Sequence, residues 1–232
     1  MLVDVLSKRK YRAKVDNVFP HVKRLSYRGA ERCFLGISLG NNTFRDDKLD
    51  AMLRWVSNWC GRCHLLIGDS IHRINISQEQ GISEEDALCE ALRMGEDFIK
   101  EVGTLLSSYQ TRMELDVITC AQLQKRHDYI ETYESLRRLC NEDMNFRASV
   151  QHFSEHYHSR KGTVYSDARL AASERYFLEE FAIFSCLVRD GCDVMVYPGT
   201  FSTLAEIAEG HFPDAPKALQ SLTTVSLCIK GI

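Results

Sequence analysis

Short apolar segments alternate with amphipathic helical segments along most of this chain. Buried strands are predicted at residues 32–38, 62–67, 113–119, 193–197 and 223–229. Apolar residues recur at helical spacing between them, at residues 46–59, 83–107, 120–156, 171–189 and 202–210. Strands that alternate with helices predict an α/β fold with a parallel, doubly wound sheet.

The length and composition favour a single domain over residues 1–232. Hydrophobic residues make up 44% of the chain, which is enough for a sizeable core, and no Gly/Ser-rich segment marks a linker. The basic N-terminal segment, residues 1–30, has no apolar run of the length that a signal peptide needs. No other stretch is apolar enough to span a membrane. We therefore expect a cytoplasmic protein, and a monomer because no coiled-coil seam is present.

Several familiar motifs are missing from the sequence. It contains no GxGxxG, GxxxxGK[ST], GxSxG or HExxH segment, so the usual signals of dinucleotide, P-loop, α/β-hydrolase and zinc-protease sites are lacking. Cys60-Gly-Arg-Cys63 has the spacing of a metal or redox pair, but no second pair exists to complete a zinc site. We predict reduced thiols and no metal.

Ligands of doubly wound sheets bind beyond the carboxyl ends of the strands, so we expect the site among the residues that follow each strand. Ser38 ends the first strand between Gly36 and Gly40. Tyr197 is followed by Pro198, which cannot continue a strand. Each pattern alone is common in purely structural positions, and together they mark one edge of the sheet.

A tyrosine and a glutamate four residues apart form the remaining candidate pair. Tyr176 and Glu180 lie one helical turn apart, so both side chains can point into one pocket. Such a pair is also a frequent feature of exposed helix surfaces, and spacing does not separate the two interpretations.

Taken in order, these segments resemble the cyclodipeptide synthase family. The resemblance rests on Phe34-Leu-Gly-Ile-Ser38-Leu-Gly-Asn41, on Tyr176-x-x-x-Glu180 and on Val196-Tyr-Pro198. Residues 65–75 and 121–134 are also similar to family segments, so the resemblance extends from about residue 30 to residue 210. Pro198 favours the Tyr-Pro branch of the family, although Asn41 is typical of the other branch.

The resemblance implies a Rossmann-like domain similar to the catalytic domain of class I tyrosyl- and tryptophanyl-tRNA synthetases. It implies that two aminoacyl-tRNAs are joined into a cyclic dipeptide without a cofactor. Ser38 would be the nucleophile that carries the aminoacyl and dipeptidyl groups. Glu180 and Tyr176 would hold the amino group of the substrate, and Tyr197 would assist proton transfer during ring closure.

Further residues are assigned to substrate binding by the same resemblance. Gly36 and Asn41 would shape the turn beside the reacting carbonyl, and Tyr129 matches a pocket tyrosine. Three apolar residues would line the pocket for the first aminoacyl group: Phe34, Ile183 and Met195. Because Phe34 is bulky, we expect a small first side chain such as that of alanine.

Binding of tRNA requires positive charge, and the predicted helix 83–107 is acidic. Residues 8–14 carry five positive charges within seven positions. Our hypothesis places tRNA on this cluster, at Lys8, Arg9, Lys10 and Arg12. The alternative is a solvated N-terminal arm without a binding role.

Three other functions remain open at this point. One is an RNA-binding or tRNA-editing protein of the same fold. Another is a serine hydrolase, which would need a histidine such as His72 or His211 near Ser38. The third is a nucleotide-binding Rossmann module, which the missing glycine fingerprint disfavours.

Overall fold

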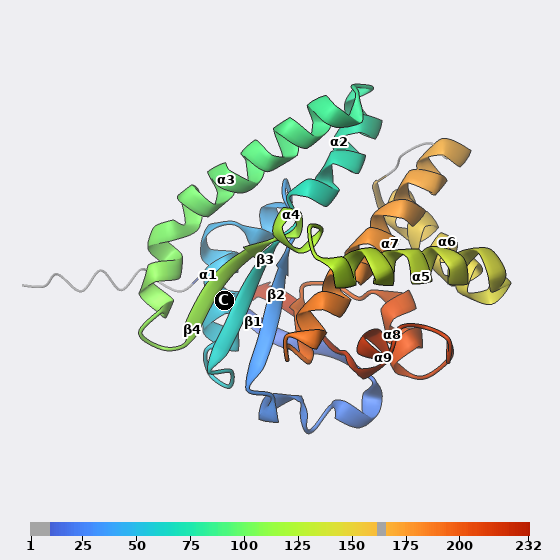
Figure 1. Cartoon of the computed structure of the whole chain (residues 1–232). Coiled ribbons are helices and arrows are strands. Elements are labelled where there is room, and N and C mark those ends of the chain that lie inside the picture. The colour runs from blue at the N-terminus through green and yellow to red at the C-terminus, as the bar shows by residue number, and fades with distance from the viewer. Residues whose placement is uncertain (1–9, 162–165) are drawn as a thin grey trace, which may run out of the picture.

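One six-stranded sheet organises the molecule (Figure 1). The computed structural model describes residues 10–161 and 166–232. The strands are β1 (Tyr11–Phe19), β2 (Arg32–Ile37), β3 (Arg62–Ile67), β4 (Glu114–Thr119), β5 (Val194–Tyr197) and β6 (Thr223–Gly231). Their order is β1-β6-β5-β2-β3-β4. All neighbours pair in parallel except β1 and β6, which are antiparallel. The predicted α/β fold with a parallel sheet is confirmed for β2 to β6, and the antiparallel edge strand β1 makes the sheet mostly rather than wholly parallel.

Helices cover both faces of this sheet (Figure 1). They are α1 (Asp46–Val56), α2 (Arg73–Gln80), α3 (Glu84–Tyr109), α4 (Cys120–Leu123), α5 (His127–Glu142), α6 (Met144–Lys161), α7 (Asp167–Arg189), α8 (Ser202–Ala208) and α9 (Lys217–Ser221). One hydrophobic cluster joins the sheet to α1 and α3. A second cluster joins the opposite face to α4 through α9, and a small third cluster joins α2 to α3. Within the described chain, no helix has the length and apolar character needed to cross a bilayer.

Strand β2 lies in the middle of the sheet and is buried on both faces. Cys33 and Leu35 belong to the cluster under α1 and α3, whereas Phe34 belongs to the cluster on the other face. Successive side chains of a strand point to opposite faces, so a strand that separates two cores must be apolar throughout. This explains why residues 32–38 read as a continuous apolar run.

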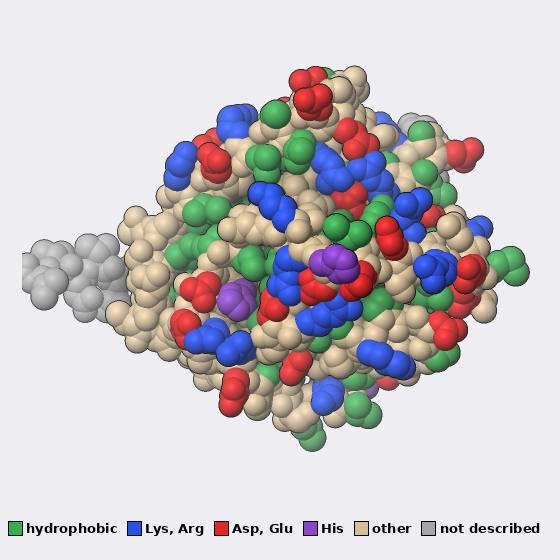
Figure 2. Space-filling view, viewed as in Figure 1, with side chains coloured by type: hydrophobic (Ala, Val, Ile, Leu, Met, Phe, Trp, Pro, Cys, Tyr) green, Lys and Arg blue, Asp and Glu red, His purple; other side chains and the backbone are tan. Residues whose placement is uncertain are grey.

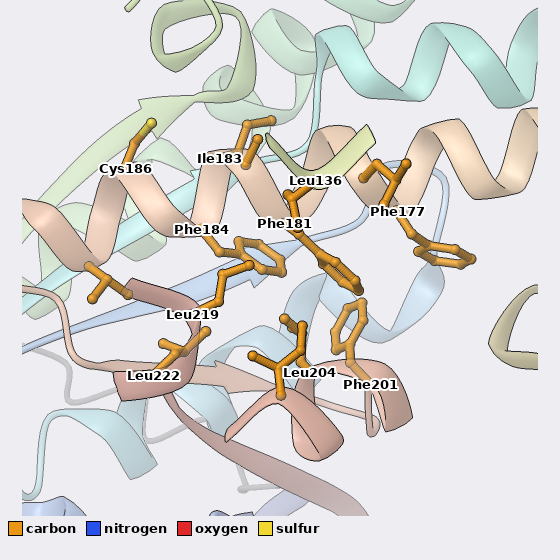
Figure 3. Close-up of a cluster of buried hydrophobic side chains, with 14 of the residues drawn as sticks. Leu136, Phe177, Phe181, Ile183, Phe184, Cys186, Phe201, Leu204, Leu219 and Leu222 are labelled. Carbon is orange, nitrogen blue, oxygen red and sulfur yellow. The ribbon is translucent and has the colours of Figure 1, made fainter. Parts of the chain in front are cut away.

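Helix α7 supplies the aromatic centre of the second core (Figure 3). Phe177, Phe181 and Phe184 project from α7 toward the segment that contains Phe201 and Leu204. The rings of Phe184 and Phe201 meet edge to face, with centroids 6.0 Å apart. Burying an aromatic side chain contributes about 1.5–3 kcal/mol, so this cluster holds α7 firmly against β5 and α8.

The structure shows two features of the secondary structure that the sequence pattern does not reveal. Part of the basic segment 1–30 forms a strand, because β1 pairs with β6 along its length. Residues 120–156 are mostly helical as predicted, but they are divided into α4, α5 and α6. Asp143 ends α5 in an extended conformation, and its carboxylate accepts hydrogen bonds from the backbone N–H groups of Asn145 and Phe146. This capping starts a new helix where apolar spacing suggests continuity.

Candidate active site

Ser38 lies in the tight turn that follows β2. Gly40 adopts a positive φ of 74°, which a residue with a β carbon rarely adopts. Asn41 then caps the short 3-10 helix η3 (Asn42–Phe44), because its Oδ1 accepts a hydrogen bond of 2.9 Å from the N–H of Thr43. The turn leaves Ser38 partly exposed at the carboxyl edge of the sheet, where the sequence predicts the site.

A cavity of about 460 Å³ opens beside Ser38. It is lined by Ser38, Asn75, His152, Phe153, Ser173, Tyr176, Phe177, Glu180, Tyr197, Pro198, Gly199, Thr200, Phe201 and Ser202. The four predicted catalytic residues are all in this set, although they come from the end of β2, from α7 and from β5. Its volume lies in the range of small-molecule sites.

Glu180 provides the acidic side chain among the described residues that line the cavity. Its Oε2 is buried and has no hydrogen-bond partner among the described residues. Burial raises the pKa of Glu180 from 4.5 to about 8, since a carboxylate is poorly solvated there. A buried carboxyl oxygen without a hydrogen-bond partner lowers the stability of the fold. A bound cationic group would supply the missing hydrogen bond and balance the charge.

Tyr197 is held at the end of β5 by close neighbours. Its ring centroid lies 5.0 Å from that of Phe201 and 5.6 Å from that of Phe44. Gly36 borders another side of the ring, where a β carbon would come within 3.3 Å of Cδ2 of Tyr197. The tyrosine is therefore fixed beside the strand that leads to Ser38.

The three residues predicted to line the first aminoacyl pocket are buried in the core. Phe34 lies opposite Met195 in the pairing of β2 with β5, and its ring centroid is 5.4 Å from that of Phe184. Ile183 is also completely buried. None of the three lines the Ser38 cavity.

Glu179, next to Glu180 on α7, is a buried residue that the sequence analysis did not single out. The guanidinium of Arg73 donates hydrogen bonds of 2.8 and 3.0 Å to its two carboxylate oxygens. Arg175 donates one of 3.0 Å and Gln124 one of 2.8 Å. This ion-pair network links α7 to α2 and to the end of α4.

Tyr129 belongs to the same network rather than to the Ser38 cavity. Its hydroxyl accepts a 3.3 Å hydrogen bond from Nε2 of Gln124, and burial raises the pKa of Tyr129. Neither His72 nor His211 lines the Ser38 cavity, but His152 of α6 does. No motif around His152 marks it in the sequence.

Comparison with known proteins adds the decisive observation. The family model described as cyclodipeptide synthase matches residues 17–189, about three quarters of the chain. The chain belongs to the cyclodipeptide synthase family. Membership implies a transferase that uses aminoacyl-tRNA. No curated protein matches the chain in sequence.

Solved structures of other family members share the fold. A cyclodipeptide synthase from Fluoribacter dumoffii aligns over 97% of this chain and 100% of its own, with a TM-score of 0.81 and 18% identity. One from Candidatus Glomeribacter gigasporarum, bound to Phe-tRNAPhe, has a TM-score of 0.64 and 16% identity over 84% of this chain and 86% of its own.

The relationship to class I synthetases is also visible. Tyrosyl-tRNA synthetase of Archaeoglobus fulgidus, complexed with L-tyrosine, aligns over 91% of this chain and 60% of its own, with a TM-score of 0.55 and 13% identity. The predicted Rossmann-like architecture, similar to the catalytic domain of those enzymes, is confirmed.

The basic cluster predicted to bind tRNA is described only in part. Lys8 and Arg9 lie outside the described residues. Lys10 forms a 2.9 Å ion pair with Asp47. Arg12 is exposed on β1, and Lys14 is exposed two residues later on the same side of the strand.

The face shown in Figure 2 has no extended surface of one charge. Acidic and basic side chains are interspersed over it. Helix α3 carries Glu84, Glu85 and Asp86 in its first turn, which is capped by the Ser83 hydroxyl. These negative charges stabilise the helix N-terminus, where the helix dipole is positive, but they repel a phosphate backbone.

The cysteines are all free. Cys60 follows α1 and Cys63 lies within β3, as the sequence pattern predicts. Among the described residues, no group of three or more histidine, cysteine, aspartate or glutamate side chains is placed to hold a metal ion.

Proposed function

We propose that this chain condenses two aminoacyl-tRNAs into a cyclic dipeptide by successive acyl transfers through Ser38. One observation carries the proposal: Ser38, Tyr176, Glu180 and Tyr197 line a single cavity. Residues separated by up to 159 positions in the sequence converge there (197 minus 38), in a member of the cyclodipeptide synthase family.

In the first transfer, Oγ of Ser38 attacks the carbonyl carbon of an aminoacyl-tRNA. The new bond joins that carbon to Oγ, the bond to the 3′ oxygen of tRNA breaks, and the serine proton ends on the departing oxygen. The aminoacyl group is then stored as an ester, which divides one difficult condensation into easier steps.

Glu180 supplies the charge partner for the α-ammonium group. Its Oε2 is buried without a hydrogen-bond partner among the described residues, and an ammonium group would donate the missing hydrogen bond to this oxygen. The positive charge favours the ionised carboxylate and lowers the raised pKa of the acid. Tyr176, one turn earlier on α7, lines the same wall and orients the amine.

The second transfer and the ring closure reuse these groups. The stored ammonium group loses a proton to Glu180, and the resulting amine attacks the carbonyl carbon of the second aminoacyl-tRNA. The bond from that carbon to the 3′ oxygen of the second tRNA breaks, and a proton from the attacking nitrogen ends on the departing oxygen. A dipeptidyl group is left on Ser38. The free amine of that dipeptide then attacks the ester, forms the second amide bond and releases Oγ. Tyr197 passes the proton from the amine toward the departing serine oxygen.

The identity of the first aminoacyl group depends on the core beside Ser38. We propose that Phe34, Ile183 and Met195 limit the room for its side chain from the core behind the cavity wall, although they do not line the cavity itself. The bulk of Phe34 would restrict that side chain to a small residue such as alanine. A panel of radiolabelled aminoacyl-tRNAs tests this proposal by measuring which ones acylate Ser38. Acylation by large residues alone would contradict it.

Two further assignments complete the proposal. Pro198 follows Tyr197 and offers no N–H group, which supports membership of the Tyr-Pro branch. The exposed side chains of Arg12 and Lys14, together with the preceding Lys8, Arg9 and Lys10, provide positive charge for the tRNA backbone.

The test is expression in a bacterial host, with mass spectrometry of the medium for cyclic dipeptides. A product that appears with the wild type and disappears with Ser38→Ala would support the reaction and the nucleophile together. If soluble protein gave no product with matched tRNAs supplied, the proposal would be wrong.

A serine hydrolase is the competing function, because His152 lines the Ser38 cavity. The proposed synthase depends on Glu180 and Tyr197, so His152→Ala should retain most of the cyclic product while Glu180→Ala abolishes it. A hydrolase would show the opposite pattern and would release free amino acid from aminoacyl esters.

A further inference from the structure

Ser38 borders two cavities rather than one. The larger, described above, opens toward α7 and β5. The second has a volume of about 180 Å³ and lies between the Ser38 turn and the middle of α3. It is lined by Ser38, Leu39, Gly40, Asn41, Arg45, Met94, Asp97, Phe98 and Glu101.

An aminoacyl ester at Ser38 extends in two directions from the attacked carbon. The amino acid lies on one side of the carbonyl group, and the ribose of the tRNA lies on the other. Glu180 and Tyr176 line the larger cavity, so the amine and side chain of the substrate occupy that side. The ribose then points away from it, toward the second cavity.

The lining of the second cavity suits a nucleoside. Met94 and Phe98 offer apolar surface to a base. The carboxylates of Asp97 and Glu101 can accept hydrogen bonds from ribose hydroxyls or from a base amine. They also repel an isolated anion, which makes a free phosphate a poor occupant.

One cation stands at the rim of this cavity. Arg45 directly precedes α1, and its side chain is exposed. Asp97, which also lines the cavity, already forms ion pairs with Arg93 at 3.2 Å and with Lys100 at 3.9 Å. A guanidinium group at this position can reach the phosphate that precedes a bound nucleoside.

We propose that the second cavity binds the 3′-terminal adenosine of aminoacyl-tRNA, with Arg45 on its 5′ phosphate. This inference rests on the proposed function. In this arrangement Met94 and Arg45 bind the tRNA, which is the leaving group of the acyl transfer. The terminal adenosine and the amino acid then occupy different cavities on the two sides of Ser38.

The test compares two acyl donors in single-turnover acylation of Ser38. One is a radiolabelled aminoacyl-tRNA, and the other is the cyanomethyl ester of the same amino acid, which has no nucleoside. Met94→Trp fills the cavity and should lower kcat/KM for the tRNA donor by about tenfold, with little change for the small ester. Arg45→Ala should raise KM for the tRNA donor by about fivefold.

The matched controls are Met94→Leu, which keeps the cavity, and Lys125→Ala, which removes an exposed charge that borders neither cavity. Both should behave as wild type. Wild-type kinetics of Met94→Trp and Arg45→Ala with tRNA would overturn the inference, as would equal losses with both donors. If Met94→Trp does not fold, the KM of the Arg45→Ala variant for the tRNA donor decides whether the inference holds. Failure of the wild type to accept any aminoacyl-tRNA would instead overturn the proposed function, and this inference with it.

Discussion

The ring of Tyr197 lies against the backbone of Gly36, so closely that a β carbon at Gly36 would stand 3.3 Å from Cδ2 of the ring. Gly36 lies in β2, two residues before Ser38 in the turn that follows this strand, and Tyr197 ends the neighbouring strand β5. The small residue thus sets the distance between the predicted nucleophile and the tyrosine that lines its cavity.

Gly36→Ala should impair catalysis more than folding. The added methyl group would displace the Tyr197 ring by a few tenths of an ångström, and displacement of a reacting group lowers kcat by about tenfold or more. Formation of the cyclic product and Tm measure the two effects. Gly29→Ala is the control, because nothing lies within 4 Å of its β carbon. Equal activity of both variants would contradict the argument.

Glu180→Gln should change the pH dependence of stability. The pKa of Glu180 is raised from 4.5 to about 8 in the folded protein, so the folded state holds a proton that the unfolded state releases. The resulting contribution to stability is complete below about pH 4.5 and is lost as the pH rises through about 8.

Glutamine resembles the protonated acid and carries no charge to bury. We therefore expect equal Tm values for wild type and Glu180→Gln near pH 4.5, and a Tm at least about 4 °C higher for the variant near pH 9. Calorimetry across this range measures the difference, and product formation should be lost. A constant difference in Tm at all pH values would show that Glu180 titrates normally.

Glu179→Ala should be strongly destabilising. The change leaves Arg73, whose side chain is only 14% exposed, without its buried carboxylate partner. Removing one member of a buried pair costs about 3–5 kcal/mol. Urea denaturation measures the loss, with Glu134→Ala on the exposed side of α5 as the control. A loss below about 1 kcal/mol would mean that the network contributes little.

Charge reversal at Lys8, Arg9, Lys10 and Arg12 should weaken tRNA binding. Each lost phosphate contact reduces the dependence of log Kd on log salt concentration by about one unit or slightly less. Binding of aminoacyl-tRNA over a series of salt concentrations measures this slope. Arg138→Glu on the exposed face of α5 is the control. Unchanged activity and salt dependence would place the tRNA elsewhere.

The alternating pattern was sufficient to predict all five parallel strands but not β1. Apolar residues in β1 begin with the expected spacing of two, at Ala13 and Val15, and then shift to Val18. The pairing register with β6 breaks between Val15 and Asn17, so the strand contains an irregularity. A bulge inserts one residue and interrupts the period on which strand prediction depends.

The family resemblance of the short motifs was sufficient to predict that Tyr176, Glu180 and Tyr197 belong to the same site as Ser38, although each motif alone was not. The motifs did not reveal Glu179 or His152. A buried carboxylate looks like any exposed glutamate until its partners are known, and Arg73 and Gln124 are distant in sequence. His152 reaches the cavity only through the packing of α6.

The antiparallel pair at the edge of the sheet has a consequence for synthesis of the chain. Tyr11 faces Gly231 across the ladder, and the pairing continues to Phe19 and Thr224. The ribosome synthesises β1 long before β6, so β1 has no partner until the distant β6 segment has also been made. Pairing over such a sequence separation is slow and leaves an unpaired edge exposed in the meantime. Charged side chains on an unpaired strand edge oppose pairing with other chains, and β1 carries Arg12, Lys14 and Asp16 as exposed residues.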